Sequence, residues 1–481
     1  MSSTTSSSNL TSGFIDLATF DEPEKYMYGG QDAVSYFVRR VRKSTWFTTV
    51  PVVLTTNNTP QFNQQFDANI SRAGDYLLYA WFRVTIPSVT LAATNQFGAT
   101  GRLRWTRNLM HNLVREMAIT FNDLVEMRLD NWYLDFWSAF TIPAGKRNGY
   151  DNMIGNIAEL INPLAVGGNG TTLPSVVLNL PIPFCHSRDT GVSLPTAALP
   201  YNEMRLRFNL RNWTDLLILD NINGAGGATY SVPVRTSGDL TATPALSSPE
   251  IWAEYAIVSG DERKRMGKKP RDILIEQVQT VTPQSVNISQ SITRENVHLS
   301  HSIKAFFFAL QNTTNTAEWS NYTSASPAIT SGPGLNFNPQ LASDPIVATS
   351  LYYENTQRLS NMGSDYFSLV QPFYKAVSIP LETGYHMYSY SLDLVNVNPM
   401  GSTNYGKLTN VGVQYAPSDN AKIAGGVTVG SSPGSTGTTS TPDSNHRSDG
   451  AALQQTFAFV LVAINHNIVR CSGGALGFPV L

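Results

Sequence analysis

Histidine and cysteine, the residue types that most often bind metals or act as nucleophiles, are few and scattered in this sequence. His298 and His301 form the one close pair among the seven histidines. Their spacing of three in an extended segment would send the two side chains to opposite faces of a strand. Cys185 and Cys471 are the only cysteines, and this usage is typical of a protein made in a reducing compartment. We predict no metal site, and a single long-range disulfide stays open as an alternative.

Two glycine-containing motifs match functional loops in spacing alone. Gly430-Ser431-Ser432-Pro433-Gly434 fits G-x-S-x-G, but a nucleophile elbow needs a strand before it and a helix after it. This stretch lies in low-complexity sequence, so we interpret it as a linker. Gly167-Gly168-Asn169-Gly170 lacks the Lys-Ser/Thr and the helix of a phosphate-binding loop, so we interpret it as a turn. His111 is interpreted as a structural histidine, and we predict no catalytic residue, no cofactor and no enzyme activity.

One basic run stands out, Arg263-Lys264-Arg265 followed by Lys268, Lys269 and Arg271. No aromatic residues interleave with it for base stacking, and Asp261 and Glu262 precede it. The net charge of -2 gives no global attraction for nucleic acid or for an anionic membrane. We interpret the run as a solvated connection between strands. A contact with an acidic neighbouring protein and a contact with nucleic acid are the alternatives, and no specific nucleic acid partner is predicted.

The chain is poor in charge. Charged residues make up 14% of the sequence, against roughly 25% in an average soluble domain, so much of the surface must be uncharged. The N-terminus has no charged region followed by an apolar one, so it is not expected to be a secretory signal. The apolar stretches 303–310 and 457–464 are about half as long as a membrane-spanning helix. We expect a soluble intracellular product.

Alternation of apolar and polar residues predicts mostly strands. From Tyr76 to Ile86 every second residue is apolar, and Pro87 ends the segment. The runs 305–310 and 457–464 are apolar on both faces, which favours sheets that are covered on both sides. The best helix candidate is 130–140, where Asp130 or Asn131 caps the first turn and Pro143 stops the helix. A shorter helical turn is expected at 106–113.

The length of 481 residues predicts two large β units or about three smaller domains. Residues 221–248 are rich in Gly, Ser and Thr and are predicted to separate two domains. Residues 425–450 have a similar composition and are predicted to form a long exposed loop. Pro183-Phe184 and Pro372-Phe373 begin a faint internal echo at an offset of roughly 190 residues, which is one large β domain. Many short strands joined by turns indicate a sandwich or jelly roll.

Several segments, spread over nearly the whole chain, are similar to those of iridovirus major capsid proteins, double jelly-roll proteins of nucleocytoplasmic large DNA viruses. These segments are residues 11–20 (TSGFIDLATF), 28–30 (YGG), 72–77 (RAGDYL), 104–112 (RWTRNLMHN), 199–203 (LPYNE), 366–372 (YFSLVQP), 401–410 (GSTNYGKLTN) and 472–481 (SGGALGFPVL). They occur in the family's order. The basic run and the insertion at 425–450 are richer than the family pattern, so those surfaces receive no role from it.

The resemblance implies an all-β protein with two tandem eight-stranded jelly-roll sandwiches and a few short helices in the loops. It divides the chain into an N-terminal arm (1–28), jelly roll 1 (29–220), a linker (221–248) and jelly roll 2 (249–481), with 425–450 in the outer tower. It also implies a non-enzymatic role in the virion capsid, assembled in the host cytoplasm.

The implied partners are the other components of the shell. A homotrimer forms a pseudo-hexagonal capsomer, and neighbouring capsomers tile an icosahedron over an internal membrane. The arm 1–28 meets minor capsid proteins and the membrane. Two other functions stay open: a carbohydrate-binding or glycosidase-type jelly-roll protein, since fold does not fix function, and a minor capsid paralogue.

Overall fold

The computed structural model describes residues 5–164, 166–221, 230–234, 236–324, 344–424 and 455–478. The exposed loop predicted at 425–450, with its Gly430 to Gly434 motif, lies outside the described residues. The chain divides into two compact units, Met1–Trp46 and Phe47–Leu481, and each is described by itself.

The unit Met1–Trp46 holds two helices, α1 (Thr5–Ala18) and α2 (Glu22–Met27). A capping box begins α2: the Asp21 side chain accepts a hydrogen bond from the Glu22 amide, and the Glu24 carboxylate accepts one from the Asp21 amide. None of the residues 9–46 is buried. A local capping signal rather than a core therefore accounts for α2. No helix in the described part of the chain is both long enough and apolar enough to cross a membrane.

The first half of the main unit is built on an eight-stranded sheet in the order β7-β6-β10-β2-β1-β13-β3-β9. Its strands are β1 (Phe47–Thr56), β2 (Gln65–Asn69), β3 (Tyr76–Ile86), β6 (Val114–Phe121), β7 (Leu124–Asp130), β9 (Val176–Pro181), β10 (Met204–Leu210) and β13 (Ser247–Val258). Strand β1 pairs with β13 along most of its length and with β2 only at its end. The sheet folds at β1, and its two layers enclose a core in which the rings of Phe66 and Phe82 pack on Phe208.

The second half is a sandwich of two sheets, which face each other across a separate core. One sheet has the order β14-β22-β16-β19 and the other β15-β21-β17-β18. The strands are β14 (Arg271–Val286), β15 (Thr293–Asn296), β16 (Ser302–Asn312), β17 (Ile346–Tyr353), β18 (Thr356–Gly363), β19 (His386–Ser389), β21 (Val411–Pro417) and β22 (Phe457–Ser472), with β20 (Thr403–Asn404) and β23 (Ala475–Gly477) at the margins of the first sheet. The stacked rings of Tyr415 and Phe459 join the two layers.

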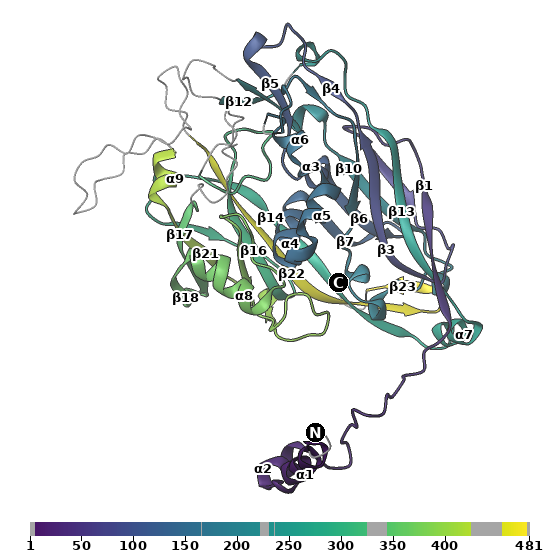
Figure 1. The fold of residues 1–481 in the computed structure, drawn as a ribbon. Helices are drawn as coiled ribbons and strands as arrows, with labels where there is room; N and C mark the ends of the chain where they lie inside the picture. Colours follow the sequence, from purple (N-terminus) through teal and green to yellow (C-terminus); the bar gives the residue numbers. More distant parts are fainter. Residues whose placement is uncertain are drawn as a thin grey trace, which may run out of the picture. The chain divides into compact units, whose positions relative to one another are not determined.

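The two doubly apolar runs are confirmed as strands covered on both faces. In β16, Phe306 and Phe308 face the core of the second half, whereas Phe307 belongs to the core cluster that also fills the first half. The sheet β14-β22-β16-β19 therefore packs with its outer face against the first half, as Figure 1 shows for β16 and β22. This double burial explains why these strands have no polar side.

The predicted strand 76–86 is confirmed as β3, with one difference at its start. Its buried residues alternate from Ala80 to Ile86 as predicted. Before that, Leu77 rather than Leu78 is buried. The pairing with β13 shifts register between Glu254 and Tyr255. Because such a bulge adds a residue to one strand, the alternation of faces changes there.

The remaining elements connect the strands. They are α3 (Leu109–Leu113), α4 (Asn131–Thr141), α5 (Ala144–Ile154), α6 (Ala158–Ile161), α7 (Gly260–Lys268), α8 (Gln371–Lys375), α9 (Asp419–Ala424) and the strands β4 (Val89–Thr90), β5 (Gly101–Trp105), β8 (Thr172–Leu173), β11 (Leu217–Asn221) and β12 (Tyr230–Pro233). The helices predicted at 130–140 and 106–113 are confirmed as α4 and α3. The Asp130 carboxylate caps α4 by accepting a hydrogen bond from the Tyr133 amide at 2.8 Å.

Residues 221–248 were predicted to form a linker, but the structure has paired strands in this range. Strands β11 and β12 border or lie within this range and form a sheet with β5. Strand β13 starts at Ser247, and its residues 250–258 pair with β1 and β3 of the first half. This pairing favours a start of the second half after Val258, later than the predicted residue 249. The glycine-rich composition of this stretch does not reveal long-range strand pairing.

The helix α7, which carries most of the basic run, makes the connection between the two halves. It joins β13 to β14, and none of its residues is buried. Arg263 donates two hydrogen bonds to the Asp75 carboxylate, at 2.7 and 2.8 Å. This agrees with the interpretation of the basic run as a solvated connection between strands, although the connection is helical.

Candidate functional site

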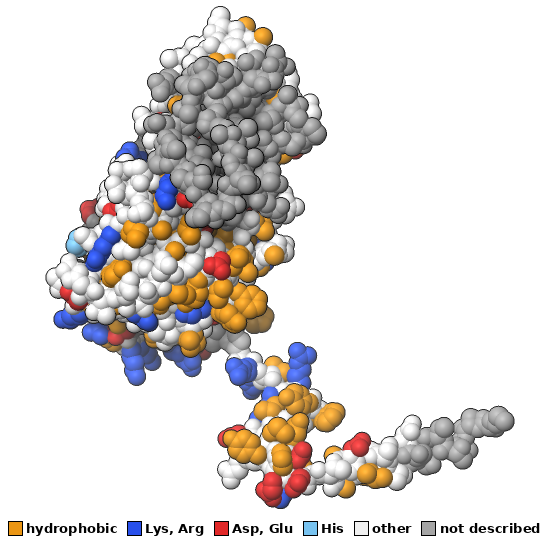
Figure 2. Space-filling view, turned by 90° about the vertical axis from the view of Figure 1, so that its left-hand side faces the viewer, with side chains coloured by type: hydrophobic (Ala, Val, Ile, Leu, Met, Phe, Trp, Pro, Cys, Tyr) orange, Lys and Arg blue, Asp and Glu red, His pale blue; other side chains and the backbone are white. Residues whose placement is uncertain are grey.

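An exposed apolar surface surrounds α8 in the second half. Phe373, Tyr374 and Leu381 are 68%, 76% and 77% exposed. We call this surface the α8 patch, and its members are Leu369, Val370, Phe373, Tyr374, Val377, Ile379 and Leu381. Figure 2 shows hydrophobic side chains gathered on the side of the main unit that carries α8. A contiguous apolar surface rimmed by polar residues usually marks a protein contact.

The α8 patch is continuous with a hollow of about 590 Å³. Phe373, Val377 and Leu381 line it on one side, and Ala144 and Arg147 of α5 line it on the other. Among these lining residues Arg147 is the one charged group. This surface can accept another apolar surface at little desolvation cost, because few charges must leave water.

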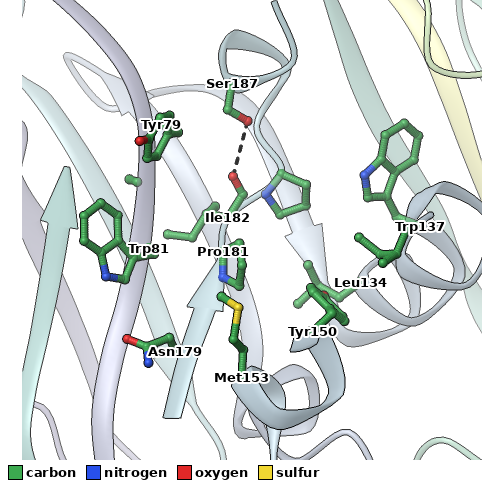
Figure 3. A pocket seen from close by; sticks show the side chains of 13 residues that line it. Tyr79, Trp81, Leu134, Trp137, Tyr150, Met153, Asn179, Pro181, Ile182 and Ser187 are labelled. Carbon is green, nitrogen blue, oxygen red and sulfur yellow. Dashed lines mark hydrogen bonds between the residues drawn. The ribbon is translucent and has the colours of Figure 1, made fainter. Parts of the chain in front are cut away.

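A second hollow, of about 490 Å³, opens on the first half. Tyr79 and Trp81 of β3 line one wall, whereas Trp137 of α4 and Met153 of α5 line another, as Figure 3 shows. Its lining residues include no aspartate or glutamate. A glycosidase site needs paired carboxylates, so this hollow is better suited to apolar contact than to that chemistry.

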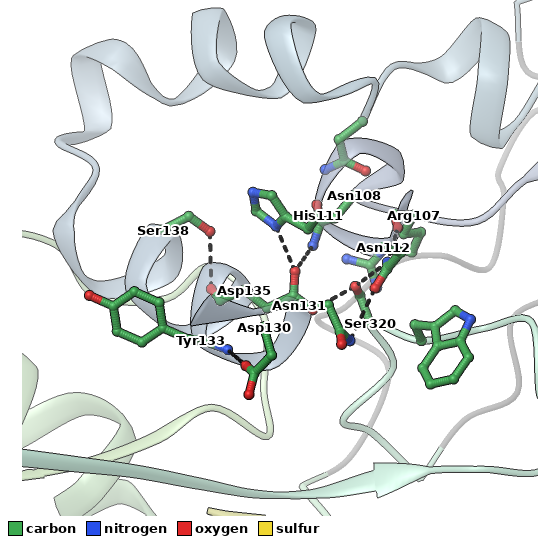
Figure 4. Close-up of polar contacts among 12 residues, drawn as sticks. Arg107, Asn108, His111, Asn112, Asp130, Asn131, Tyr133, Asp135, Ser138 and Ser320 are labelled. Carbon is green, nitrogen blue, oxygen red and sulfur yellow. Dashed lines mark hydrogen bonds and ion pairs between the residues drawn. The ribbon is translucent and has the colours of Figure 1, made fainter. Parts of the chain in front are cut away.

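The seam between the two halves is organised around the Asp135 carboxylate of α4. One oxygen lies 2.7 Å from Nδ1 of His111 and accepts a hydrogen bond from Asn108. The other oxygen accepts hydrogen bonds from Ser320 at 2.6 Å and from Tyr322 at 3.1 Å, both in the second half. Figure 4 shows Asn108, His111 and Ser320 around the Asp135 carboxylate. Every polar side chain named here is buried, so the network fixes how the halves meet.

A buried ion cluster crosses the same seam. Arg104 of β5 contacts Asp220 of β11 and Glu318 of the second half, each at 2.8 Å, and all three side chains are essentially fully buried. Burial lowers the pKa of the Arg104 guanidinium, but the two carboxylates outweigh this effect and raise the pKa. A buried charge left without its partner costs several kcal/mol. The cluster therefore favours the one arrangement of the two halves in which its three charges are paired.

The histidines and glycines that the sequence analysis considered occupy separate places in the structure. His111 is a satisfied structural histidine as predicted, because its Nε2 also lies 2.7 Å from the Tyr150 hydroxyl. His298 is exposed, and His301 is partly buried at the start of the β16 segment. Gly167 and Gly170 lie in a turn with positive φ. Cys185 and Cys471 are both buried and not disulfide-bonded.

One group of described residues has the composition of a metal site, which the sequence analysis did not predict. Glu126, Cys185 and His186 are buried, and their ligand atoms all lie within 4.8 Å of one another. The adjacent Cys185 and His186 were visible in the sequence, but Glu126 lies 60 residues before His186, on strand β7. Sequence spacing alone gave no reason to join them.

Two family models match almost the whole chain. Residues 35–257 match the model of the major capsid protein N-terminus, and residues 262–477 match that of the large eukaryotic DNA virus major capsid protein. The chain belongs to this family of viral major capsid proteins. The major capsid protein of Costelytra zealandica iridescent virus is 56% identical over 99% of both chains. That of Rana tigrina ranavirus is 42% identical over 100% of both.

Solved structures show the fold of this capsid protein. A quasi-atomic model of the PBCV-1 virus capsid matches with a TM-score of 0.69 and 19% identity, covering 93% of this chain and 100% of that chain. The Faustovirus major capsid protein matches with a TM-score of 0.63 and 12% identity, covering 95% and 96%. The two sandwiches are thus a double jelly roll, as predicted. The relatives are structural components of virions, so this chain is a capsid protein and not an enzyme.

Proposed function

We propose that three copies of this capsid protein close into a trimer and that these trimers act as pseudo-hexagonal capsomers, which tile an icosahedral shell over an internal membrane. Each chain has two sandwiches of similar construction. A ring of three such chains would present six similar edges to its neighbours, which suits hexagonal packing.

The α8 patch is the observation that carries the trimer proposal. In a closed ring of identical subunits, one surface of each chain meets a different surface of the next. The described chain offers two unlike apolar surfaces, the protruding α8 patch on the second half and the hollow at Trp81 and Trp137 on the first half. Association would remove both from water at a gain of about 25 cal/mol per Å² of apolar area.

The arm 1–28 is proposed to contact minor capsid proteins and the membrane at the base of the capsomer. Phe14, Ile15 and Leu17 of α1 are exposed, and the unit that contains them has no buried residue among those described. A segment of this kind commonly becomes ordered by contact with a partner. We also propose that residues 425–450 belong to the outer tower, and cleavage of intact particles within this loop by a protease would support that assignment.

The variant Phe373→Glu tests the proposed trimer contact. A carboxylate at this 68%-exposed position should leave folding intact, but it would have to lose its hydration in an apolar contact. We expect light scattering to give the mass of a single chain, 52.7 kDa, where the unaltered chain gives a trimer.

The matched control is Ile292→Glu, which places the same charge on an exposed apolar residue (56%) of a loop away from α8. It should leave the mass unchanged. A trimer that persists in Phe373→Glu with unaltered stability would remove the α8 patch from the contact.

A further inference from the structure

Three buried side chains of the first half lie close together, and the proposed capsid function does not involve them. Glu126 lies on β7, and Cys185 and His186 begin a short 3-10 turn, Cys185–Ser187. Their exposed fractions are 1%, 4% and 3%, and one ligand atom of each lies within 4.8 Å of the other two. A carboxylate, a thiol and an imidazole are thus held together away from water.

The imidazole of His186 has the orientation of a metal ligand. Its Nδ1 lies 2.8 Å from the Val192 carbonyl oxygen, which only accepts, so Nδ1 carries a hydrogen. Its Nε2 faces the Glu126 carboxylate, at 2.8 and 3.1 Å. Histidines that bind metals commonly donate the second ring N–H to a carbonyl, which frees the other nitrogen for the ion.

The second cysteine of the chain lies in the same region. Cys471 on β22 pairs with Arg271 on β14, and Arg271 donates a hydrogen bond at 2.6 Å to the carbonyl of Gly191, the neighbour of Val192. Burial raises the pKa of the Cys471 thiol to about 11, and the charge of His186 acts in the opposite direction. Cys471 therefore lies near this region but is not part of the group formed by Glu126, Cys185 and His186.

A charged His186 beside Glu126 would account for two of these groups. Burial lowers the pKa of His186, but its interactions with Cys185 and Glu126 outweigh this effect and raise the pKa well above its usual value. An ion pair between His186 and Glu126 leaves the Cys185 thiol without a role. Thiolate, imidazole and carboxylate together are the ligand set of tetrahedral Zn²⁺.

We propose that Glu126, Cys185 and His186 bind a Zn²⁺ ion, with a water molecule in the fourth position. On binding, the ion replaces the thiol proton of Cys185 and any proton on Nε2 of His186, and these protons pass to solvent. The ion would join β7 to the turn after β9. It would act as a structural staple within the first jelly roll, independent of trimer formation.

Metal analysis of the untagged full-length protein, purified without chelators, tests the proposal. We expect about one zinc per chain, and less than about a tenth of that in Cys185→Ser and in His186→Gln. The matched control is His298→Gln, which alters an exposed histidine and should retain the zinc. Folded wild-type protein without zinc, or zinc that persists in both site variants, would overturn the proposal.

Cobalt substitution gives a second readout. Co²⁺ bound by cysteine has a thiolate charge-transfer absorption. We expect this band in the wild type and in Cys471→Ser, and its loss in Cys185→Ser. Absence of the band in wild-type protein loaded with Co²⁺ would contradict thiolate binding, and a band that persists in Cys185→Ser would remove Cys185 from the site.

Discussion

The Asp135 carboxylate receives contacts from both jelly rolls, through His111 and Asn108 on one side and Ser320 and Tyr322 on the other. In Asp135→Asn the amide keeps one acceptor oxygen, so donors on one side lose their partner. Because a buried donor without a partner costs about 1–3 kcal/mol, we expect the melting temperature to fall by about 1–3 °C. Differential scanning calorimetry measures the change.

The control for Asp135→Asn is Asp261→Asn, which removes a charge at an exposed position of α7. It should shift the melting temperature by less than about 1 °C. If the two variants melted alike, Asp135 would not hold the seam.

At the residue scale, the sequence predicted whether a side chain is structural better than it predicted which residues that side chain contacts. His111 was correctly interpreted as structural, but its partners Asp135 and Tyr150 lie 24 and 39 residues away. Nothing in the local pattern names them, because three-dimensional proximity decides the contacts. The same holds for Glu126, whose approach to Cys185 and His186 depends on how β7 passes the turn after β9.

Among the elements, α4 joins the halves most directly, because Phe136 and Phe140 both stack on Phe307 of β16. Its N-cap, Asp130, also accepts a hydrogen bond from Thr280 of β14. Asp130→Ala removes both bonds, and we expect a loss of about 2 kcal/mol of stability, seen as a fall of roughly 2 °C in the melting temperature.

Asp130→Asn serves as the matched variant, since asparagine caps a helix about as well as aspartate. It should recover most of the stability lost in Asp130→Ala. Equal losses in the two variants would mean that the charge of Asp130, and not its cap, is what matters.

Elements with a local signature were predicted from the sequence, and elements defined by distant pairing were not. Strand β3 has an alternating pattern, and α4 has a cap and a terminating proline, so both were found. The range 221–248 was predicted as a linker from its glycine and serine content, which gives no sign of β12 or of the start of β13. The partners of β13, β1 and β3, lie some 160 to 210 residues earlier.

At the scale of the whole molecule, the double jelly roll was predicted because segments spread along the chain resemble one family. The assembly surfaces were not predicted, since the sequence alone cannot distinguish Phe373, which is exposed, from Phe367, which is buried. Two unlike apolar surfaces on one chain are what a closed ring of identical copies requires. They link the fold to the proposed trimer.

The mass of the purified full-length chain, measured by light scattering with negative-stain imaging of the same sample, tests the capsomer proposal most directly. The account predicts particles of three times the 52.7 kDa chain mass with a hexagonal outline. A compact monomer that does not assemble at any concentration would contradict it.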